Sequence, residues 1–172
     1  MSYDMSETNN HHDTTSDQGR KKVSEHAQKP RVFDMYRDNI LDYSQNPRNK
    51  GEIENPDLHF RDVNPLCGDE LEFFVKLDKN NKITDIKFQG SGCAISQAAA
   101  SMITEELLGK TLKDLINYDK KRILKLLGIE ISPAREKCAF LSLRVLKLAA
   151  YSKLGKKELE LKEKLDEEGL GY

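Results

Sequence analysis

Apolar residues occupy every second position of residues 70–77, where they are Leu71, Phe73, Val75 and Leu77. A period of two residues places these four side chains on one face of the chain, so the stretch predicts a β-strand with one buried face. A polar connection of hairpin length, residues 78–82, leads to a second apolar stretch over residues 83–89, which predicts a returning strand. Residues 58–63 predict a shorter strand. The sequence therefore predicts a small antiparallel sheet.

Helical patterns flank this sheet on both sides. Before it, apolar residues at helical spacing over residues 32–43 predict a helix that ends before the Asn46-Pro47 pair. After it, residues 94–108 are rich in alanine and predict a longer helix.

The rest of the chain is helical by pattern as well. Thr111 and Asp119 are the expected N-caps of two shorter helices, and Ser132 followed by Pro133 opens the last long helix. Strands followed by helices predict an α+β domain, in which helices pack on one face of a three-stranded antiparallel sheet.

Three regions differ in composition. Residues 1–30 are polar, with Val23 the only large aliphatic residue, and predict a disordered tail in which His11 and His12 are solvated rather than metal ligands. Residues 31–155 form the predicted folded domain. Residues 156–172 are charged between their leucines and predict a C-terminal helical extension that is frayed or faces solvent.

Composition excludes several classes of function. The chain has 172 residues, of which 37% are hydrophobic and 33% charged, with a formal net charge of −1. Lysines and arginines are scattered among acidic residues, so no basic field of the kind that binds nucleic acid is expected. No apolar run reaches the roughly 20 residues that span a bilayer, and no secretory leader is evident. We therefore expect a cytoplasmic protein with no membrane or nucleic-acid partner.

The cysteines are the clearest candidates for function. The chain has three of them, Cys67, Cys93 and Cys138, and an odd number in a reducing compartment favours a metal or a reactive thiol over disulfides. Cys67 precedes the strongest strand and lies two residues from Asp69, Cys93 opens the alanine-rich helix, and Cys138 falls early in the last helix. Three thiolates and the Asp69 carboxylate make a complete four-coordinate set for a soft or borderline metal.

The spacing of these cysteines, 26 and then 45 residues, differs from zinc fingers, which pair cysteines two to four residues apart. Ligands at the edges of distant elements predict a partly open site. The helix beginning at Cys93 and the cations Arg135 and Lys137 beside Cys138 favour thiolates at both places. Three unrelated buried thiols, or a cysteine nucleophile with His59 as its base, remain as alternatives.

Four ordered blocks, residues 43–51, 67–69, 90–96 and 137–139, resemble the U-type iron-sulfur cluster assembly proteins: IscU, SufU and the NifU N-terminal domain. The resemblance covers residues 33–154. It implies an antiparallel sheet with helices on one side and a scaffold that takes sulfur from a cysteine desulfurase. Such a scaffold builds a [2Fe-2S] cluster and passes it to apo-proteins that accept it, or to a carrier.

The resemblance also implies roles for single residues. Cys67, Cys93 and Cys138 resemble the thiolates that bind the cluster or metal, with Cys138 a candidate persulfide carrier, and Asp69 resembles the carboxylate that keeps the cluster labile. IscU-type members have a histidine before the third cysteine, where this chain has Lys137. Whether the cluster requires a homodimer is left open.

Two alternatives to the scaffold follow. SufU-type proteins resemble zinc-dependent sulfurtransferases, in which the same three cysteines and aspartate hold Zn²⁺ and relay persulfide sulfur. That branch usually carries an insertion between the second and third cysteines, which this chain lacks. The second alternative is a structural module stabilised by zinc that binds partners through its helices. A scaffold or carrier, rather than an enzyme, is the favoured interpretation.

Overall fold

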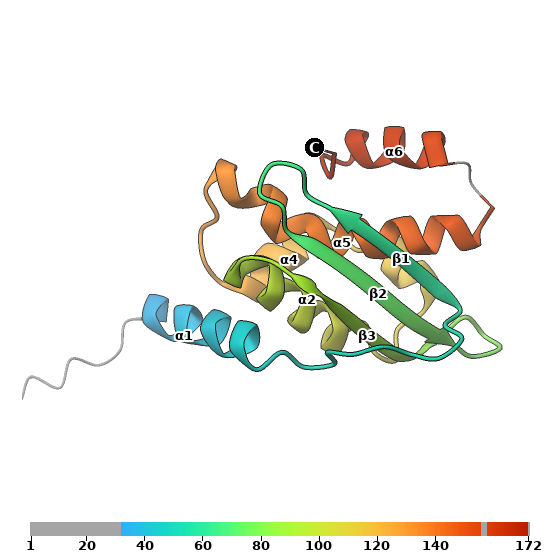
Figure 1. Ribbon diagram of the computed structural model, residues 1–172, viewed down its shortest axis with the longest axis horizontal. Coiled ribbons are helices and arrows are strands. Elements are labelled where there is room, and N and C mark those ends of the chain that lie inside the picture. Colours follow the sequence, from blue (N-terminus) through green and yellow to red (C-terminus); the bar gives the residue numbers. More distant parts are fainter. Residues whose placement is uncertain (1–31, 156–157, 172) are drawn as a thin grey trace, which may run out of the picture.

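Three antiparallel strands form one sheet with the order β1-β2-β3. They are β1 (Leu58–Val63), β2 (Glu70–Leu77) and β3 (Ile83–Ser91), each where the sequence predicts a strand. The computed structural model describes residues 32–155 and 158–171, and Figure 1 shows the helices gathered on one side of this sheet. The predicted α+β architecture is confirmed.

The helices divide into a layer on the sheet and two outer elements. α2 and α5 pack against each other and against the strands, α3 and α4 connect them, α1 lies along α2, and α6 lies along α5. Their bounds are α1 Val32–Gln45, α2 Ala94–Leu107, α3 Leu112–Ile116, α4 Lys120–Leu127, α5 Pro133–Lys153 and α6 Glu158–Glu167.

The core lies between the inner face of the sheet and α2 and α5. Leu71, Phe73 and Val75 of β2 are completely buried there, and the Phe73 ring stacks on Phe88 of β3 with centroids 5.7 Å apart. Burying one such side chain contributes about 2–3 kcal/mol. The alternation in β2 is therefore the pattern of a strand that buries one face.

Local sequence signals set the ends of the helices. α1 ends at Gln45, just before Asn46-Pro47, and the Thr111 side chain accepts from the backbone N–H of Asp114 in a capping box. The Asp119 side chain caps α4 by accepting from the backbone N–H of Arg122. α5 begins at Pro133 as predicted, although the Ser132 side chain makes no capping hydrogen bond.

The connections at one end of the sheet bring the cysteines near each other. In the register of the sheet Glu70 lies opposite Ser91, so the loop that enters β2 is beside the chain that leaves β3 for α2. α5 passes behind the same end of β1 and β2 (Figure 1). The sheet register thus positions Asp69 beside the start of α2.

The C-terminal segment differs from its prediction. α6 and the residues after it fold back on α5, where Leu165 is completely buried and Leu170 is 4% exposed. Glu168 pairs with Lys147 and also accepts from the Tyr151 hydroxyl at 3.3 Å. The expectation of a frayed or solvent-facing extension is wrong for the described part, because the segment carries apolar residues that α5 covers.

Residues 1–31, with the predicted tail and His11 and His12, lie outside the described residues. Among the described helices, none is both long enough and apolar enough to span a bilayer.

Candidate metal centre

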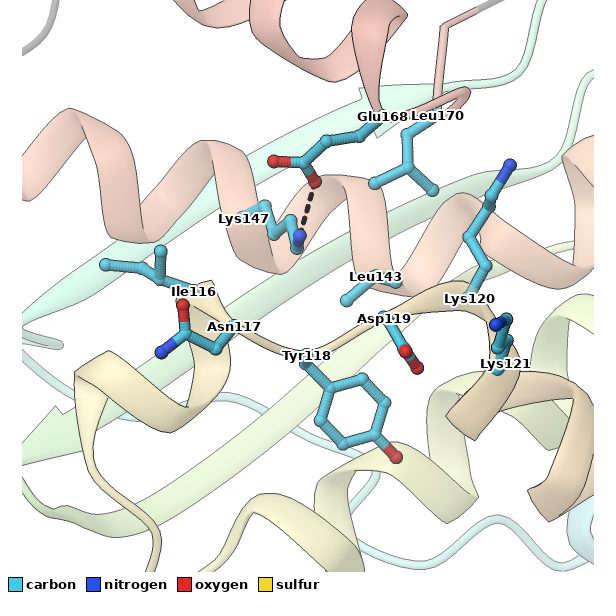
Figure 2. A pocket seen from close by; sticks show the side chains of 10 residues that line it. All are labelled: Ile116, Asn117, Tyr118, Asp119, Lys120, Lys121, Leu143, Lys147, Glu168 and Leu170. Atoms are coloured by element: carbon cyan, nitrogen blue, oxygen red, sulfur yellow. Dashed lines mark hydrogen bonds and ion pairs between the residues drawn. The ribbon is translucent and has the colours of Figure 1, made fainter.

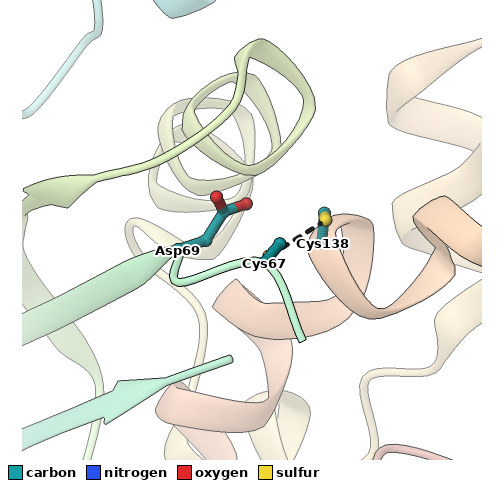
Figure 3. Close-up of side chains that lie close together, drawn as sticks. All are labelled: Cys67, Asp69 and Cys138. Carbon is teal, nitrogen blue, oxygen red and sulfur yellow. Dashed lines mark hydrogen bonds between the residues drawn. The ribbon is translucent and has the colours of Figure 1, made fainter. Parts of the chain in front are cut away.

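Three of the predicted ligands meet at one point. The ligand atoms of Cys67, Asp69 and Cys138 lie within 4.8 Å of one another. Figure 3 shows Cys67 and Asp69 on the β1–β2 loop, Asp69 just before β2, and Cys138 in the first turns of α5. The two sulfur atoms are 3.4 Å apart. Residues 71 positions apart in the sequence therefore form one compact donor set.

Asn64 shapes the loop that carries Cys67. This residue is completely buried; its backbone carbonyl accepts from the N–H of Gly68 at 2.8 Å, and its side-chain oxygen accepts from the N–H of Leu66 at 3.1 Å. Its amide nitrogen donates to Cys138 Sγ at 4.0 Å. Asn64 is not among the predicted site residues, although Asn before Pro is a recognisable signal for a turn built by a side chain.

Two glycines are needed for separate reasons. Gly68 has φ +73° with open space around it, so only its backbone conformation favours glycine. A Cβ at Gly92 would lie 2.5 Å from Ser96 Oγ and 2.8 Å from Asp69 Cγ. Glycine at position 92 therefore lets the Asp69 carboxylate sit against the entry to α2.

The two carboxylate oxygens of Asp69 have different surroundings. Its Oδ1 accepts from the backbone N–H of Cys93 at 3.2 Å, whereas Oδ2 is buried with no hydrogen-bond partner among the described residues. Burial raises the pKa of Asp69, but hydrogen bonds from Ser96 and Cys93 outweigh burial and leave the pKa below its ordinary value. A buried anionic oxygen without a donor is what a cation would satisfy.

The surroundings of the Cys138 thiol favour its protonated form. It is 3% exposed, and burial raises its pKa far above the ordinary range, with the hydrogen bond to Cys67 and nearby negative charge adding to the effect. Arg135 and Lys137 were expected to favour a thiolate here, but burial and nearby negative charge shift the pKa in the opposite direction. The Lys137 ammonium donates instead to the backbone carbonyl of Gly171. Metal binding at this site would therefore release a proton.

Cys93 lies outside the group of three. It occupies the N-cap position of α2, with its side chain making no capping hydrogen bond, and it is partly exposed. It is linked to the group through Asp69, whose carboxylate interacts with the Cys93 side chain and accepts from its backbone N–H at 3.2 Å. Its role as the fourth ligand stays a prediction.

His59 belongs to another part of the molecule. On the outer face of the sheet its ring stacks on Phe74 at 4.8 Å, and its Nε2 lies 2.6 Å from Glu72 Oε1. It has no contact with a thiol among the described residues, so the arrangement gives no support to a cysteine nucleophile with His59 as base.

The donor set fits a soft or borderline metal. Two sulfurs and a carboxylate oxygen already converge, the carboxylate lacks a partner on one oxygen, and a third sulfur begins the adjacent helix. Zinc and iron both accept such mixed sulfur and oxygen ligands.

Comparison with known proteins identifies the family of the chain. Residues 35–160 match the NifU-like N terminal domain family. The chain belongs to the NifU-like N-terminal domain family. The resemblance to U-type assembly proteins that the sequence blocks indicate is thereby confirmed.

Two relatives of this NifU-like chain carry different functional names. The iron-sulfur cluster assembly scaffold protein IscU 1 of Archaeoglobus fulgidus is 37% identical over 139 residues, which cover 77% of this chain and 90% of that protein. The zinc-dependent sulfurtransferase SufU of Bacillus subtilis is 36% identical over 129 residues, which cover 65% and 86%.

A solved structure supports the fold of this NifU-like domain independently. The N-terminal part of a nitrogen-fixing NifU-like protein from Brucella abortus superimposes with a TM-score of 0.59. The alignment covers 73% of this chain and 99% of that one at 21% identity, so this likeness concerns the fold alone.

Proposed function

We propose that this protein is an iron-sulfur cluster assembly scaffold. It receives sulfur from a cysteine desulfurase, assembles a labile [2Fe-2S] cluster on Cys67, Asp69, Cys93 and Cys138, and transfers the cluster to apo-proteins. The observation that carries the proposal is the meeting of two thiols with a buried carboxylate that has an unpartnered oxygen. The scaffold named among the relatives supports it.

The donor set accounts for lability. A carboxylate oxygen is a harder and weaker partner for iron than a fourth thiolate, so a cluster bound partly through Asp69 has one weak attachment. The Cys67 loop is exposed, which leaves one side of the site open to an acceptor. Transfer requires both a weak bond and an open side.

Accessibility supports Cys67 as the first acceptor of sulfur and Cys138 as a later holder. The Cys67 thiolate attacks the outer sulfur of the desulfurase persulfide, a new S–S bond forms on Cys67, and the donor's S–S bond breaks to return the donor's thiolate. This transfer needs no external reductant, whereas converting the persulfide sulfur to the sulfide of a cluster takes two electrons, which a thiol reductant such as cysteine supplies. Cys138 lies 3.4 Å from Cys67, within reach of a second exchange of the same kind.

A zinc-dependent sulfurtransferase is the second candidate. The observations in its favour are the 36% identity to a protein of that name and Lys137 at the position before Cys138. The Lys137 ammonium donates to the backbone carbonyl of Gly171 and cannot bind a metal. The ligands proposed for the metal are therefore the three cysteines and Asp69. In this alternative Zn²⁺, when bound, holds thiolates deprotonated at neutral pH.

Anaerobic reconstitution with ferrous iron, cysteine and a desulfurase tests the two candidates. Visible absorption with iron and sulfide quantitation follows the cluster, and a zinc-loaded sample is assayed in parallel for stimulation of the desulfurase. A transferable chromophore that depends on the cysteines supports the scaffold. Failure to hold iron and sulfide, together with zinc-dependent stimulation that Cys67→Ala and Cys138→Ala abolish, favours the sulfurtransferase.

A further inference from the structure

The C-terminal segment is held against α5 by basic side chains. Lys137 donates to the carbonyl of Gly171, Arg144 Nη1 donates to the carbonyl of Leu170 at 3.0 Å, and Lys147 pairs with Glu168. Figure 2 shows Lys147 and Glu168 joined beside Leu170, along a cavity of about 390 Å³ between this segment, α5 and residues 116–121. Apolar burial and charge pairing thus fix the same segment.

Arg144 differs from its neighbours because it also reaches the sheet. Its Nε donates to Asp62 Oδ2 at 2.8 Å, and its side chain is 6% exposed. A planar guanidinium holds two oxygen partners in fixed directions, which a lysine ammonium does not. Arg144 therefore joins β1, α5 and the carbonyl of Leu170 rigidly.

Both elements that Arg144 joins carry site residues. Asp62 lies near the end of β1, two residues before Asn64, whose backbone and side chain shape the Cys67 loop. Arg144 lies six residues after Cys138 on α5, about 9 Å along the helix at 1.5 Å per residue. The contact between Asp62 and Arg144 thus spans the two supports of the 3.4 Å sulfur pair.

Burial makes this contact costly to break. A buried cation with a missing partner is strongly disfavoured, so removing either partner changes the positions of the groups around it. Leu170, 4% exposed, takes part in the same contact through its backbone carbonyl, which accepts from Arg144 Nη1 at 3.0 Å. The match to the family ends at residue 160, so residues 168–171 lie beyond the matched region.

We propose that Arg144, backed by the C-terminal segment, is a positioning residue for the metal centre. It fixes the end of β1, and with it the Cys67 loop, against the start of α5, and with it Cys138. The site is thereby arranged before metal arrives. This inference rests on the proposed function only in taking Cys67 and Cys138 as ligands.

Zinc affinity of the full-length protein, measured by competition with a chromogenic chelator, tests the inference. Arg144→Lys keeps the positive charge but loses the planar guanidinium that donates in two fixed directions. Leu170→Ser removes a buried apolar side chain and should loosen the C-terminal segment from α5. We expect about 10-fold weaker Zn²⁺ binding in each, the lower end of effects seen when supports of metal ligands are removed. Hydrogen exchange of the metal-free protein should show faster exchange in residues 64–68, with β2 and β3 unchanged.

Two matched controls separate positioning from general damage. Arg61 makes a paired contact with Glu70 at 2.8 Å on the outer face of the sheet, so Arg61→Lys makes the same chemical change one residue from Asp62. Leu154 is 54% exposed, so Leu154→Ser matches the change at Leu170. Both should bind Zn²⁺ within about twofold of the parent, as expected for surface changes.

The outcomes are distinct. Unchanged zinc affinity in Arg144→Lys and Leu170→Ser, or an equal loss in the controls, overturns the positioning role. Wild-type protein that binds no zinc at all counts against the metal site itself, and hydrogen exchange in residues 64–68 then decides the positioning role alone. Slower or unchanged exchange there in Arg144→Lys would overturn it.

Discussion

Cys67 and Cys138 have sulfur atoms 3.4 Å apart and opposite surroundings. Cys67 is exposed on a loop, whereas Cys138 is 3% exposed on a long helix whose neighbours form the core. The loop is shaped by a few hydrogen bonds from Asn64, and the helix by extensive apolar packing. One half of the candidate site is thus adjustable and reachable, and the other half is fixed and sheltered.

The difference suggests a division of work within the site. A cargo that is received and released needs an open side, and a metal that is held needs rigid ligands. Asp69 belongs to the sheltered half by burial, at 5% exposed, although it is only two residues from Cys67. The boundary between the halves therefore lies at Gly68, whose positive φ turns the chain.

The largest effect expected is loss of metal binding when a ligand is removed from either half. Cys67→Ala and Cys138→Ala should each weaken Zn²⁺ binding by about 100-fold or more, because the four ligands of such a site share roughly 10–16 kcal/mol. Chelator competition measures the loss, and thermal unfolding without metal shows whether folding is affected. Replacing buried Cys138 should change metal-free stability more than replacing exposed Cys67; the reverse order would contradict the division.

A smaller effect is expected from the two glycines that border the site. In Gly92→Ala the new Cβ would meet Ser96 and Asp69, and crowding of this kind costs about 2 kcal/mol. Gly68→Ala meets no atom within 4 Å, so only the strained backbone remains, at about 1 kcal/mol. Zinc titration and thermal unfolding of both variants test this order, and equal losses would show that Asp69 does not need the space at Gly92.

The two thiols should also differ in reactivity with pH. Burial raises the pKa of Cys138, so less of it is thiolate at any given pH, and iodoacetamide should label Cys67 about 10-fold faster in the metal-free protein at pH 8. The rate at which iodoacetamide labels Cys138 should continue to increase at pH values above the ordinary thiol pKa of about 8.5. Mass spectrometry of the labelled peptides measures both rates, and denaturant should abolish the difference.

The same pKa shift has a consequence for stability. The folded protein holds the Cys138 proton more tightly than the unfolded chain, so this contribution is complete below the unfolded thiol pKa of about 8.5 and is lost as pH rises above it. Metal-free protein should therefore unfold more easily at pH 10 than at pH 8 by chemical denaturation. The prediction is contradicted if the two cysteines are labelled at equal rates and stability does not fall between pH 8 and pH 10. Both thiols would then have the same surroundings.

Local patterns predicted most of the fold. Signals that act over a few residues can be recognised in the sequence. They include the alternation in residues 70–77, the helix end before Asn46-Pro47, and the caps at Thr111 and Asp119. The packing of α6 against α5 could not be predicted in this way. Leu165 and Leu170 are surrounded by charged residues in the sequence, and their burial depends on partners on α5.

The candidate site was predicted in identity but not in its electrostatics. The sequence gives no measure of how deeply Cys138 is buried or that Gly171 attracts the Lys137 ammonium. Both depend on contacts between elements distant in the sequence. For the same reason Asn64 was missed, since its donation to Cys138 spans 74 residues.

The smallest effect concerns Cys93, which lies outside the group formed by Cys67, Asp69 and Cys138. Its side chain makes no capping hydrogen bond and is partly exposed, so Cys93→Ala should change the free energy of unfolding by less than about 1 kcal/mol. Its backbone N–H, which contacts Asp69, is retained.

A scaffold therefore keeps its helical circular dichroism in this variant without metal and loses cluster binding if Cys93 is the fourth ligand. A structural zinc module would instead lose its helical signal, because metal binding would then supply folding free energy. Cys93→Ser, of similar size, is the control for the cavity that alanine leaves, and unfolding in both variants would count against the scaffold.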